Sequence, residues 1–229
     1  MLARLIETRD LAAQVRHFVF EIPELEEFAF TPGQFVSCVA QVDGAPVTRA
    51  YSIAAPPSGN RFELCLNRVP EGMFSPYLFD LEPGHTIEVK GPVGTFVWRD
   101  PPSDAVLVAT GTGIAPFRAM LQERVPADFG HRYTLLFGVR YESGILYREE
   151  FEAMQRQYPN FRFWPTLSRG TPDWPGRRGH VQEHLFEATG GRQDLRVYIC
   201  GLKAMVDEVR AMLKEAGFDR RQIVYEKYD

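Results

Sequence analysis

Cysteine is scarce in this sequence, where Cys38, Cys65 and Cys200 are the three thiols among 229 residues. An odd number of cysteines at wide spacing does not indicate a disulfide framework. Three thiols also cannot supply the four ligands of a typical two-iron, two-sulfur cluster, so any such cluster would sit on another polypeptide. The five histidines show no metal-ligand spacing. The sequence therefore predicts no metal site.

Long apolar runs and an excess of positive charge are also missing. No apolar run approaches the roughly 18 residues that span a membrane. The segment 1–7 lacks the long apolar core of a signal peptide and is expected to be the first strand of a cytoplasmic protein. Residues 1–99 hold 8 basic and 12 acidic side chains and residues 100–229 hold 18 of each. Neither half is basic enough to indicate a nucleic-acid partner.

The chain changes character near residues 99–104. Before this point, short strand-like runs alternate with turn signals such as Pro32-Gly33 and Pro83-Gly84. Many short strands at such spacing are typical of an antiparallel β-barrel. We expect one short helix near Ser75–Leu81. The expected strands, besides the first, are 15–20, 34–40, 49–54, 61–68 and 86–90.

After residue 104 the pattern alternates strand and helix. This order predicts a parallel, Rossmann-like sheet with helices on both faces. The expected strands are 105–109, 133–139, 161–166, 197–200 and 223–225. The expected helices are 116–124, 148–158, 181–188 and 203–216. We therefore predict two domains, an antiparallel barrel over residues 1–99 and an α/β domain over residues 100–229.

A glycine-rich loop follows the first strand of the second half. The sequence Thr110-Gly111-Thr112-Gly113 leads from an apolar run into a helical pattern that contains Pro116. Glycines let the backbone approach an anion, and a helix N-terminus offers free N–H donors. The spacing differs from the Gly-x-Gly-x-x-Gly dinucleotide fingerprint, so by itself the motif is equally consistent with a structural turn.

Two further motifs lie in the first half. The run Arg49-Ala50-Tyr51-Ser52 places a cation, an aromatic ring and a hydroxyl on one strand, with Arg49 and Tyr51 on the same face. Downstream, Gly72-Met73-Phe74-Ser75 leads into the short helix, where backbone N–H groups and the Ser75 hydroxyl are suited to a pyrophosphate. By residue chemistry alone, a plain strand and a capped helix explain both motifs as well.

Taken together, the motifs resemble the plant-type ferredoxin–NADP⁺ reductase family, and the resemblance covers nearly the whole chain. The motifs occur in one order: Arg49-x-Tyr51-Ser52, Gly72-x-x-Ser75, Gly91-Pro92-Val93-Gly94, Thr110 to Arg118, and Cys200-Gly201-Leu202-Lys203-x-Met205. The resemblance implies an FAD-binding barrel followed by an NADP(H)-binding α/β domain. It also implies hydride transfer between nicotinamide and flavin, and single-electron exchange with a protein carrier.

The resemblance assigns roles on the flavin side. It implies that Arg49 pairs with the flavin pyrophosphate, that Tyr51 packs against the isoalloxazine and that the Ser52 hydroxyl lies near flavin N5. Met73, Phe74 and Ser75 would form the phosphate cradle at the short helix.

On the nucleotide side, the resemblance implies that Thr110, Gly111, Thr112 and Gly113 bind the NADP pyrophosphate and nicotinamide end. Ser168 and Arg169 end a strand and would hold the 2′-phosphate, although an exposed loop arginine is commonplace. Arg140 is a second candidate contact. The adenosine-contacting tyrosine of the plant members is replaced by His180, so that either Arg178 or His180 takes its role.

Three residues near the chain's end complete the expected hydride-transfer site. Cys200 follows an apolar strand, where a free cysteine is ordinarily a small buried hydrophobe, but the family places it against the nicotinamide. Glu226 and Tyr228 match the family's Glu-x-Tyr ending, which sets the ring over the flavin; otherwise Tyr228 is a strand-edge packing residue. Asp229 is an extra residue after this tyrosine.

We therefore predict an NADPH-dependent, FAD-containing oxidoreductase whose catalytic residues are Ser52, Cys200, Glu226 and Tyr228. Its expected partner is a ferredoxin or flavodoxin, and the reductase is expected to be monomeric. One alternative is the reductase component of a multicomponent oxygenase, with a preference for NADH. Another is a flavin-binding sensor without turnover.

Overall fold

The computed structural model describes residues 1–42 and 44–228, and these divide into two compact units. The first unit holds Met1–Trp98 together with Ala115–Glu123, and the second holds Arg99–Ile114 together with Arg124–Asp229. No helix in the described part of the chain is long and apolar enough to cross a membrane. The extra C-terminal residue Asp229 lies outside the described residues.

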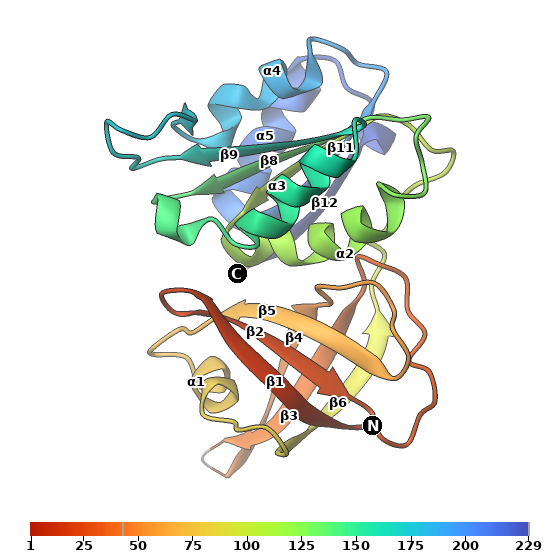
Figure 1. The fold of residues 1–229 in the computed structure, drawn as a ribbon, viewed down its shortest axis with the longest axis vertical. Helices are drawn as coiled ribbons and strands as arrows, with labels where there is room; N and C mark the ends of the chain where they lie inside the picture. Colours follow the sequence, from red (N-terminus) through yellow and green to blue (C-terminus); the bar gives the residue numbers. More distant parts are fainter. Residues whose placement is uncertain (43, 229) are drawn as a thin grey trace. The chain divides into compact units, whose positions relative to one another are not determined.

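The first unit is built on a six-stranded sheet in the order β4-β3-β6-β1-β2-β5, in which neighbouring strands run antiparallel (Figure 1). A bridge between Ile53, just after β4, and Leu64 of β5 joins the two ends of this order. The antiparallel fold predicted from the sequence for this part of the chain is thereby confirmed. Its elements are β1 (Leu2–Ala12), β2 (Val15–Glu21), β3 (Phe35–Val42), β4 (Ala45–Ser52), β5 (Arg61–Asn67), α1 (Phe74–Phe79) and β6 (Thr86–Val93).

Alternation of buried and exposed side chains explains why these segments form strands. In β2, Phe18 and Phe20 are buried and face the core, where Phe20 stacks on Phe62 of β5 at 5.4 Å between ring centroids. Aromatic rings on facing strands bury much apolar area, which stabilises the pairing. The short helix α1 adds Phe74 and Leu78 to the same core.

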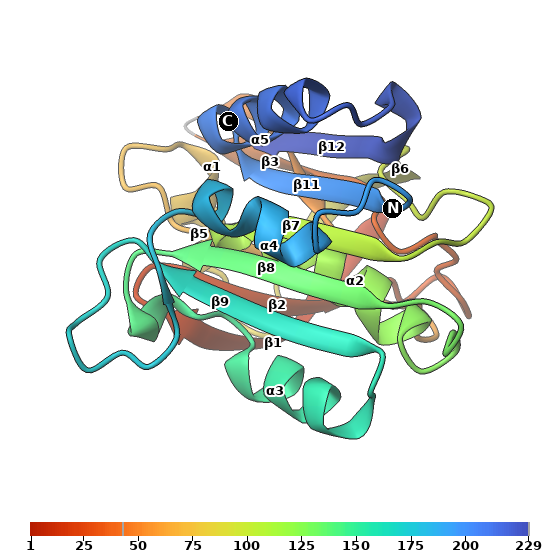
Figure 2. The same cartoon turned by 90° about the horizontal axis from the view of Figure 1, so that it is seen from above.

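The second unit is a parallel six-stranded sheet in the order β10-β9-β8-β7-β11-β12 (Figure 2). In Figure 1, α4 and α5 lie on one face of the sheet and α3 on the other. The predicted Rossmann-like class is confirmed. The elements are β7 (Ala105–Thr110), β8 (Tyr133–Val139), α3 (Arg148–Gln157), β9 (Phe161–Leu167), β10 (Arg177–Arg178), α4 (Leu185–Thr189), β11 (Arg196–Leu202), α5 (Lys203–Glu215) and β12 (Ile223–Tyr228). Helix α2 (Ile114–Arg124) follows β7 in the chain, but its stretch Ala115–Glu123 belongs to the first unit.

The strands expected over 1–7, 86–90 and 223–225 continue to Ala12, Val93 and Tyr228 in the structure, and two other elements differ more in kind or position. The helix expected over 181–188 is a 3₁₀ turn over Val181–His184 followed by α4, which ends at Gly190 in the left-handed region. The strand expected over 49–54 begins at Ala45 and ends at Ser52, because the chain then leaves β3 and pairs with β5 at Ile53.

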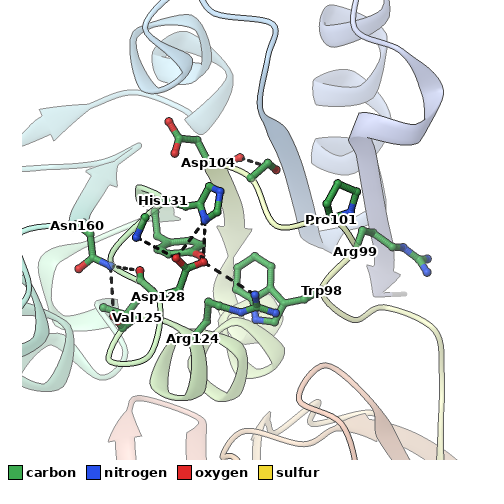
Figure 3. A network of polar contacts seen from close by, with 12 residues as sticks. Trp98, Arg99, Pro101, Asp104, Arg124, Val125, Asp128, His131 and Asn160 are labelled. Atoms are coloured by element: carbon green, nitrogen blue, oxygen red, sulfur yellow. Dashed lines mark hydrogen bonds and ion pairs between the residues drawn. The ribbon is translucent and has the colours of Figure 1, made fainter.

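A polar network ties the ends of α2 and the starts of β8 and β9 together (Figure 3). The Asp128 carboxylate accepts hydrogen bonds from the Tyr133 hydroxyl at 2.7 Å and the Gly130 amide at 3.0 Å. It also lies 2.9 Å from His131 Nδ1. Burial would raise the pKa of Asp128, but the hydrogen bonds from these partners outweigh it and hold the pKa below its ordinary value.

We predict that Asp128→Asn lowers the free energy of unfolding at pH 7 by about 1–2 kcal/mol, because charge-assisted hydrogen bonds are lost. The lowered pKa of Asp128 means that the ionised carboxylate stabilises the fold fully above its ordinary pKa of 3.8. This stabilisation is lost as the pH falls through the folded value. In urea titrations, the gap between wild type and variant should therefore shrink below about pH 4. The exposed Asp173→Asn serves as control; a gap that is constant with pH would contradict the assignment.

Candidate functional site

The carboxyl ends of β7 and β11 are packed together through glycines. A Cβ added to Gly113 would come within 2.7 Å of the Gly201 Cα and closer still to the Cys200 carbonyl oxygen. A Cβ on Gly201 would meet Thr110, whose carbonyl oxygen would be 2.9 Å away. The Thr110 hydroxyl in turn accepts a hydrogen bond from the Leu202 amide at 3.3 Å. Ligands of parallel sheets bind at this end, so the glycines hold the loop directly beside Cys200.

Gly111 differs from its neighbours because the space around it is open. Its φ of +53° is one that glycine adopts readily, and a Cβ placed there would meet nothing within 4 Å. Gly111 and the half-buried Thr112 lie in a 3₁₀ turn that leads into α2. An open, positive-φ glycine before a helix N-terminus suits a phosphate that must approach the backbone.

The structure brings Cys200, Glu226 and Tyr228 together. Cys200 pairs with Glu226 across β11 and β12, and Leu202 pairs with Tyr228. The alternation of side chains along each strand places the three expected residues on one face of the sheet. The opposite face carries Ile199 and Ile223 into the core against α5.

The Cys200 side chain is a neutral thiol. It is fully buried, and burial together with the Glu226 carboxylate raises its pKa well above the ordinary value, while a hydrogen bond with Tyr228 offsets part of the rise. A thiol with a raised pKa is a poor nucleophile and a poor metal ligand at neutral pH. Cys200 is therefore suited to shaping an apolar contact beside a charged carboxylate.

Two arginines emerge side by side at the ends of β8 and β9. The Arg169 amide donates to the Arg140 carbonyl oxygen at 2.8 Å, and the Ser168 amide donates to the Val139 carbonyl oxygen at 3.0 Å. Arg140 and Arg169 are exposed, and within the described residues no acidic group pairs with either guanidinium. Two uncompensated guanidinium groups and a hydroxyl form a donor set that a phosphate monoester would satisfy.

Arg178 is held within its own loop. Its Nη2 donates to the carbonyl oxygens of Pro172 at 2.5 Å and Trp174 at 3.0 Å, and the buried Trp174 ring donates to the Arg177 carbonyl oxygen. His180, by contrast, is exposed at the start of the 3₁₀ turn before α4. Arg178 and His180 are the two alternatives for the residue that contacts the adenosine. The Arg178 guanidinium is already hydrogen-bonded to loop carbonyl oxygens, whereas the His180 side chain is exposed.

In the first unit, β4 presents the residues expected on the flavin side. Arg49 pairs with Cys38 and Tyr51 with Val36, two buried residues of β3, so Arg49 and Tyr51 share a face. The Arg49 guanidinium is exposed and donates at 2.8 Å to the carbonyl oxygen of Thr48. Such an exposed guanidinium beside a half-buried ring fits the phosphate and ring of a flavin nucleotide.

Ser52 and the segment before α1 complete this half of the site. Ser52 is buried at the end of β4. The Ser75 hydroxyl accepts a hydrogen bond from the Val69 amide at 2.9 Å, which folds the loop onto the first turn of α1. Phe74 is buried 6.1 Å from the Tyr51 ring, whereas Met73 is half-exposed. Ser75 therefore orders the loop, and its hydroxyl hydrogen is still available to an acceptor.

Comparison with known proteins identifies both units. The family model "Oxidoreductase FAD-binding domain" matches residues 2–98, and "Oxidoreductase NAD-binding domain" matches residues 107–211. Ferredoxin–NADP reductase B of Sorangium cellulosum is 43% identical over 99% of this chain and 97% of its own length. The chain belongs to the ferredoxin–NADP reductase family. This confirms the resemblance found in the sequence and the expectation of FAD- and NAD(P)-binding domains.

Other relatives show how widely this two-domain reductase is used. The toluate 1,2-dioxygenase electron transfer component of Pseudomonas putida is 28% identical over 99% of this chain and 67% of its own length. In structure, the Amycolatopsis cytochrome P450 reductase GcoB matches with a TM-score of 0.89 and 30% identity, over 98% of this chain and 68% of that one.

Sequence reasoning missed two features of the reductase's site. One is the close contact of Gly201 with Thr110, which depends on strand pairing that a single sequence does not show. The inward hydrogen bonds of Arg178 were also missed. A partial signal was present in Pro175-Gly176, because a Pro-Gly dipeptide marks a tight turn.

We predict that Gly111→Ala weakens NADP⁺ binding at least tenfold in calorimetric titrations, because a methyl group occupies the space that the phosphate approaches. The matched control is Gly190→Ala, because Gly190 has a similar φ of +63° and equally open surroundings. Both variants should lose about 1–2 kcal/mol of stability from the same backbone strain. Equal NADP⁺ affinity in the two variants would rule out Gly111 as part of the phosphate site.

Proposed function

We propose that this reductase transfers a hydride between NADPH and FAD and exchanges single electrons with a ferredoxin or flavodoxin. The observation that carries the proposal is the arrangement at the carboxyl end of the second sheet. The glycine loop that is suited to a phosphate packs directly against the strand end that carries Cys200, with Glu226 and Tyr228 on the same face. A nucleotide held by this loop would have its reactive end beside those three side chains.

FAD, when bound, supplies the redox chemistry, since its N5 accepts a hydride and its ring system releases electrons one at a time. Arg49 would neutralise the pyrophosphate, and Met73, Phe74 and Ser75 would form its cradle. Tyr51 would pack against the ring system. The buried Ser52 would place its hydroxyl at N5, where a hydrogen bond orients the reacting atom.

NADPH would be held at both of its phosphate groups. Thr110, Gly111, Thr112 and Gly113 would bind the pyrophosphate, and Ser168 with Arg140 and Arg169 would bind the 2′-phosphate. Arg178 would act indirectly, by fixing the loop that carries Ser168 and Arg169. His180 would contact the adenosine.

At the hydride-transfer point, each side chain has a distinct task. The neutral Cys200 thiol would contact the nicotinamide without forming a bond to it. The Glu226 carboxylate would stabilise positive charge on the oxidised nicotinamide ring. Tyr228 would cover the flavin and give way when the nicotinamide enters.

Surface charge would contribute to the choice of electron carrier, since complementary charges steer the encounter of two proteins. Arg16 and Arg68 both lie over the Phe79 ring, with guanidinium carbons 4.7 Å and 6.0 Å from its centroid. Asp10 and Asp80 pair with these two arginines, so the cluster carries little net charge.

A second candidate function is the reductase component of an oxygenase, and the name of the Pseudomonas putida relative favours it.

We also propose a domain organisation, an oligomeric state and a cellular location for this reductase. We take residues 1–99 as the FAD-binding domain and 100–229 as the NADP-binding domain, acting as a monomer. The protein would act in the cytoplasm, where thiols are kept reduced. The three cysteines, Cys38, Cys65 and Cys200, are buried free thiols, which is consistent with that location.

We predict that Arg169→Ala raises KM for NADPH roughly 10- to 100-fold, because one charge-assisted contact is worth about 1.5–3 kcal/mol. The KM for NADH, which lacks the 2′-phosphate, should not change. Arg162→Ala is the matched control, since Arg162 is exposed at the opposite end of the same strand and donates to the Pro159 and Phe161 carbonyl oxygens. Equal losses for both nucleotides would contradict a 2′-phosphate site at Arg169.

We predict that Tyr228→Ser binds NADP⁺ more tightly, by up to about tenfold, because an aromatic stack worth about 0.5–1.5 kcal/mol no longer competes with the nicotinamide. Turnover should fall, since tighter ground-state binding slows release. Tyr228→Phe keeps the ring but loses the hydrogen bond with Cys200, so its NADP⁺ affinity should match wild type. If Tyr228→Phe instead binds like Tyr228→Ser, the hydroxyl rather than the ring controls nicotinamide entry.

A further inference from the structure

An ion pair between the buried Arg118 and the half-buried Glu63 in the first unit has no part in the site described so far. Arg118 Nη1 lies 2.6 Å from Glu63 Oε2, and the side chain of Arg118 is 9% exposed. Glu63 belongs to β5, and Arg118 belongs to the stretch of α2 that forms part of the first unit. Burying a charged pair is costly, so a pair of this kind is poor evidence for a purely stabilising role.

The same guanidinium nitrogen holds the backbone beside Ser52. Arg118 Nη1 donates to the Ala54 carbonyl oxygen at 2.8 Å, and the Ala54 amide donates to the Glu63 carbonyl oxygen at 2.7 Å. Both backbone groups of Ala54 are therefore held by the two members of the ion pair. Ala54 is two residues beyond Ser52, where the chain leaves β3 and crosses to β5.

A second buried side chain, that of His17, faces the same carboxylate. His17 of β2 is 3% exposed, and its Nε2 lies 3.4 Å from Glu63 Oε2. Register explains the contact: His17 pairs with Cys65 and Val19 pairs with Glu63, so His17 and Glu63 are diagonal neighbours on one face of the strands. Two elements thus converge on the Glu63 carboxylate, β2 through His17 and α2 through Arg118. The segment after β4 is held beside them, because the Ala54 amide donates to the backbone carbonyl oxygen of Glu63.

We infer that Arg118 and Glu63 are positioning residues that fix the Ser52 hydroxyl for hydride transfer. The inference rests on the proposed function, because it takes Ser52 to face the reacting atom of the flavin. Hydride transfer tolerates little error in geometry, and a displacement of about 1 Å costs roughly 100-fold in rate. Residues 52–54 cross from pairing with β3 to pairing with β5. Without the hydrogen bond from Arg118 to the Ala54 carbonyl oxygen, the backbone of this segment would be more mobile. Arg118 acts through Ala54 and touches no reacting atom.

The test is a double-mutant cycle with Ser52→Ala and Arg118→Met, followed by anaerobic stopped-flow reduction with NADPH. Arg118→Met keeps an apolar stem and removes the guanidinium contacts with Ala54 and Glu63. We expect each single variant to slow flavin reduction roughly 10- to 100-fold. If Arg118 acts through Ser52, the double variant should be little slower than Ser52→Ala alone. Rate losses that multiply would overturn the inference.

Two further measurements separate positioning from stability. In Arg118→Met the Glu63 carboxylate is left without its ion-pair partner, and adding Glu63→Gln removes that unpaired charge. The double variant should therefore regain the Tm of the wild type, measured on the flavin-free protein, while its flavin reduction stays slow. Recovery of both together would show a structural role only. The absorption spectrum of bound, oxidised FAD should also shift in the same direction in Arg118→Met and Ser52→Ala.

Controls keep this test distinct from that of the proposed function. Arg118→Lys retains one donating nitrogen and should recover most of the rate. The exposed Arg61→Met, on the same strand as Glu63, should leave rate, spectrum and Tm unchanged. A wild-type protein that NADPH does not reduce would refute the proposed function. A wild type that is reduced, with Arg118→Met equally fast, would refute the positioning role alone.

Discussion

The nucleotide half of this reductase depends on direct contact between two backbone segments. At the ends of β7 and β11, glycines leave no side chain between the loop and the neighbouring strand. Gly113 rests on the Cys200 backbone, and Gly201 rests on Thr110. A single methyl group at either position would have to push the loop and the strand apart. The close fit serves chemistry, because it sets the phosphate loop next to the strand end where Cys200, Glu226 and Tyr228 share a face.

The charged side chains of the second unit divide into those used internally and those left available. Arg178 is spent on two carbonyl oxygens and shapes its loop, whereas Arg140 and Arg169 project from adjoining strand ends without carboxylate partners among the described residues. An arginine that is already satisfied gains little from a ligand, whereas an uncompensated one can pair with a phosphate at small cost. This difference is the reason why we assign Arg169 to the phosphate and Arg178 to the internal structure of the loop.

The sequence predicted the fold well because both sheets follow simple patterns. Alternating burial around Phe18 and Phe20 marks the barrel strands, and β-branched runs separated by helical segments mark the parallel sheet. The exact element ends were less predictable. The chain crosses from β3 to β5 after Ser52 because of a bridge between Ile53 and Leu64, and no local pattern encodes that crossing.

The candidate site was predictable where a motif carried it and unpredictable where tertiary contact did. Cys200, Glu226 and Tyr228 come together through strand pairing in the expected way. The Glu63–Arg118 pair joins residues 55 positions apart. Glu63 alternates with the apolar residues Phe62 and Leu64 as in an ordinary half-buried strand, so nothing in the sequence indicated that its carboxylate pairs with Arg118.

The most direct test of the account is an isotope effect on flavin reduction in the wild-type reductase. FAD-loaded protein is mixed without oxygen with NADPH or with NADPH carrying deuterium at the transferred position of C4, and the flavin absorbance near 450 nm is followed. The account predicts that the flavin bleaches completely and that the deuterated nucleotide bleaches it several-fold more slowly, because the C4–hydrogen bond breaks in that step. A flavin that stays oxidised in the presence of NADPH would contradict the account.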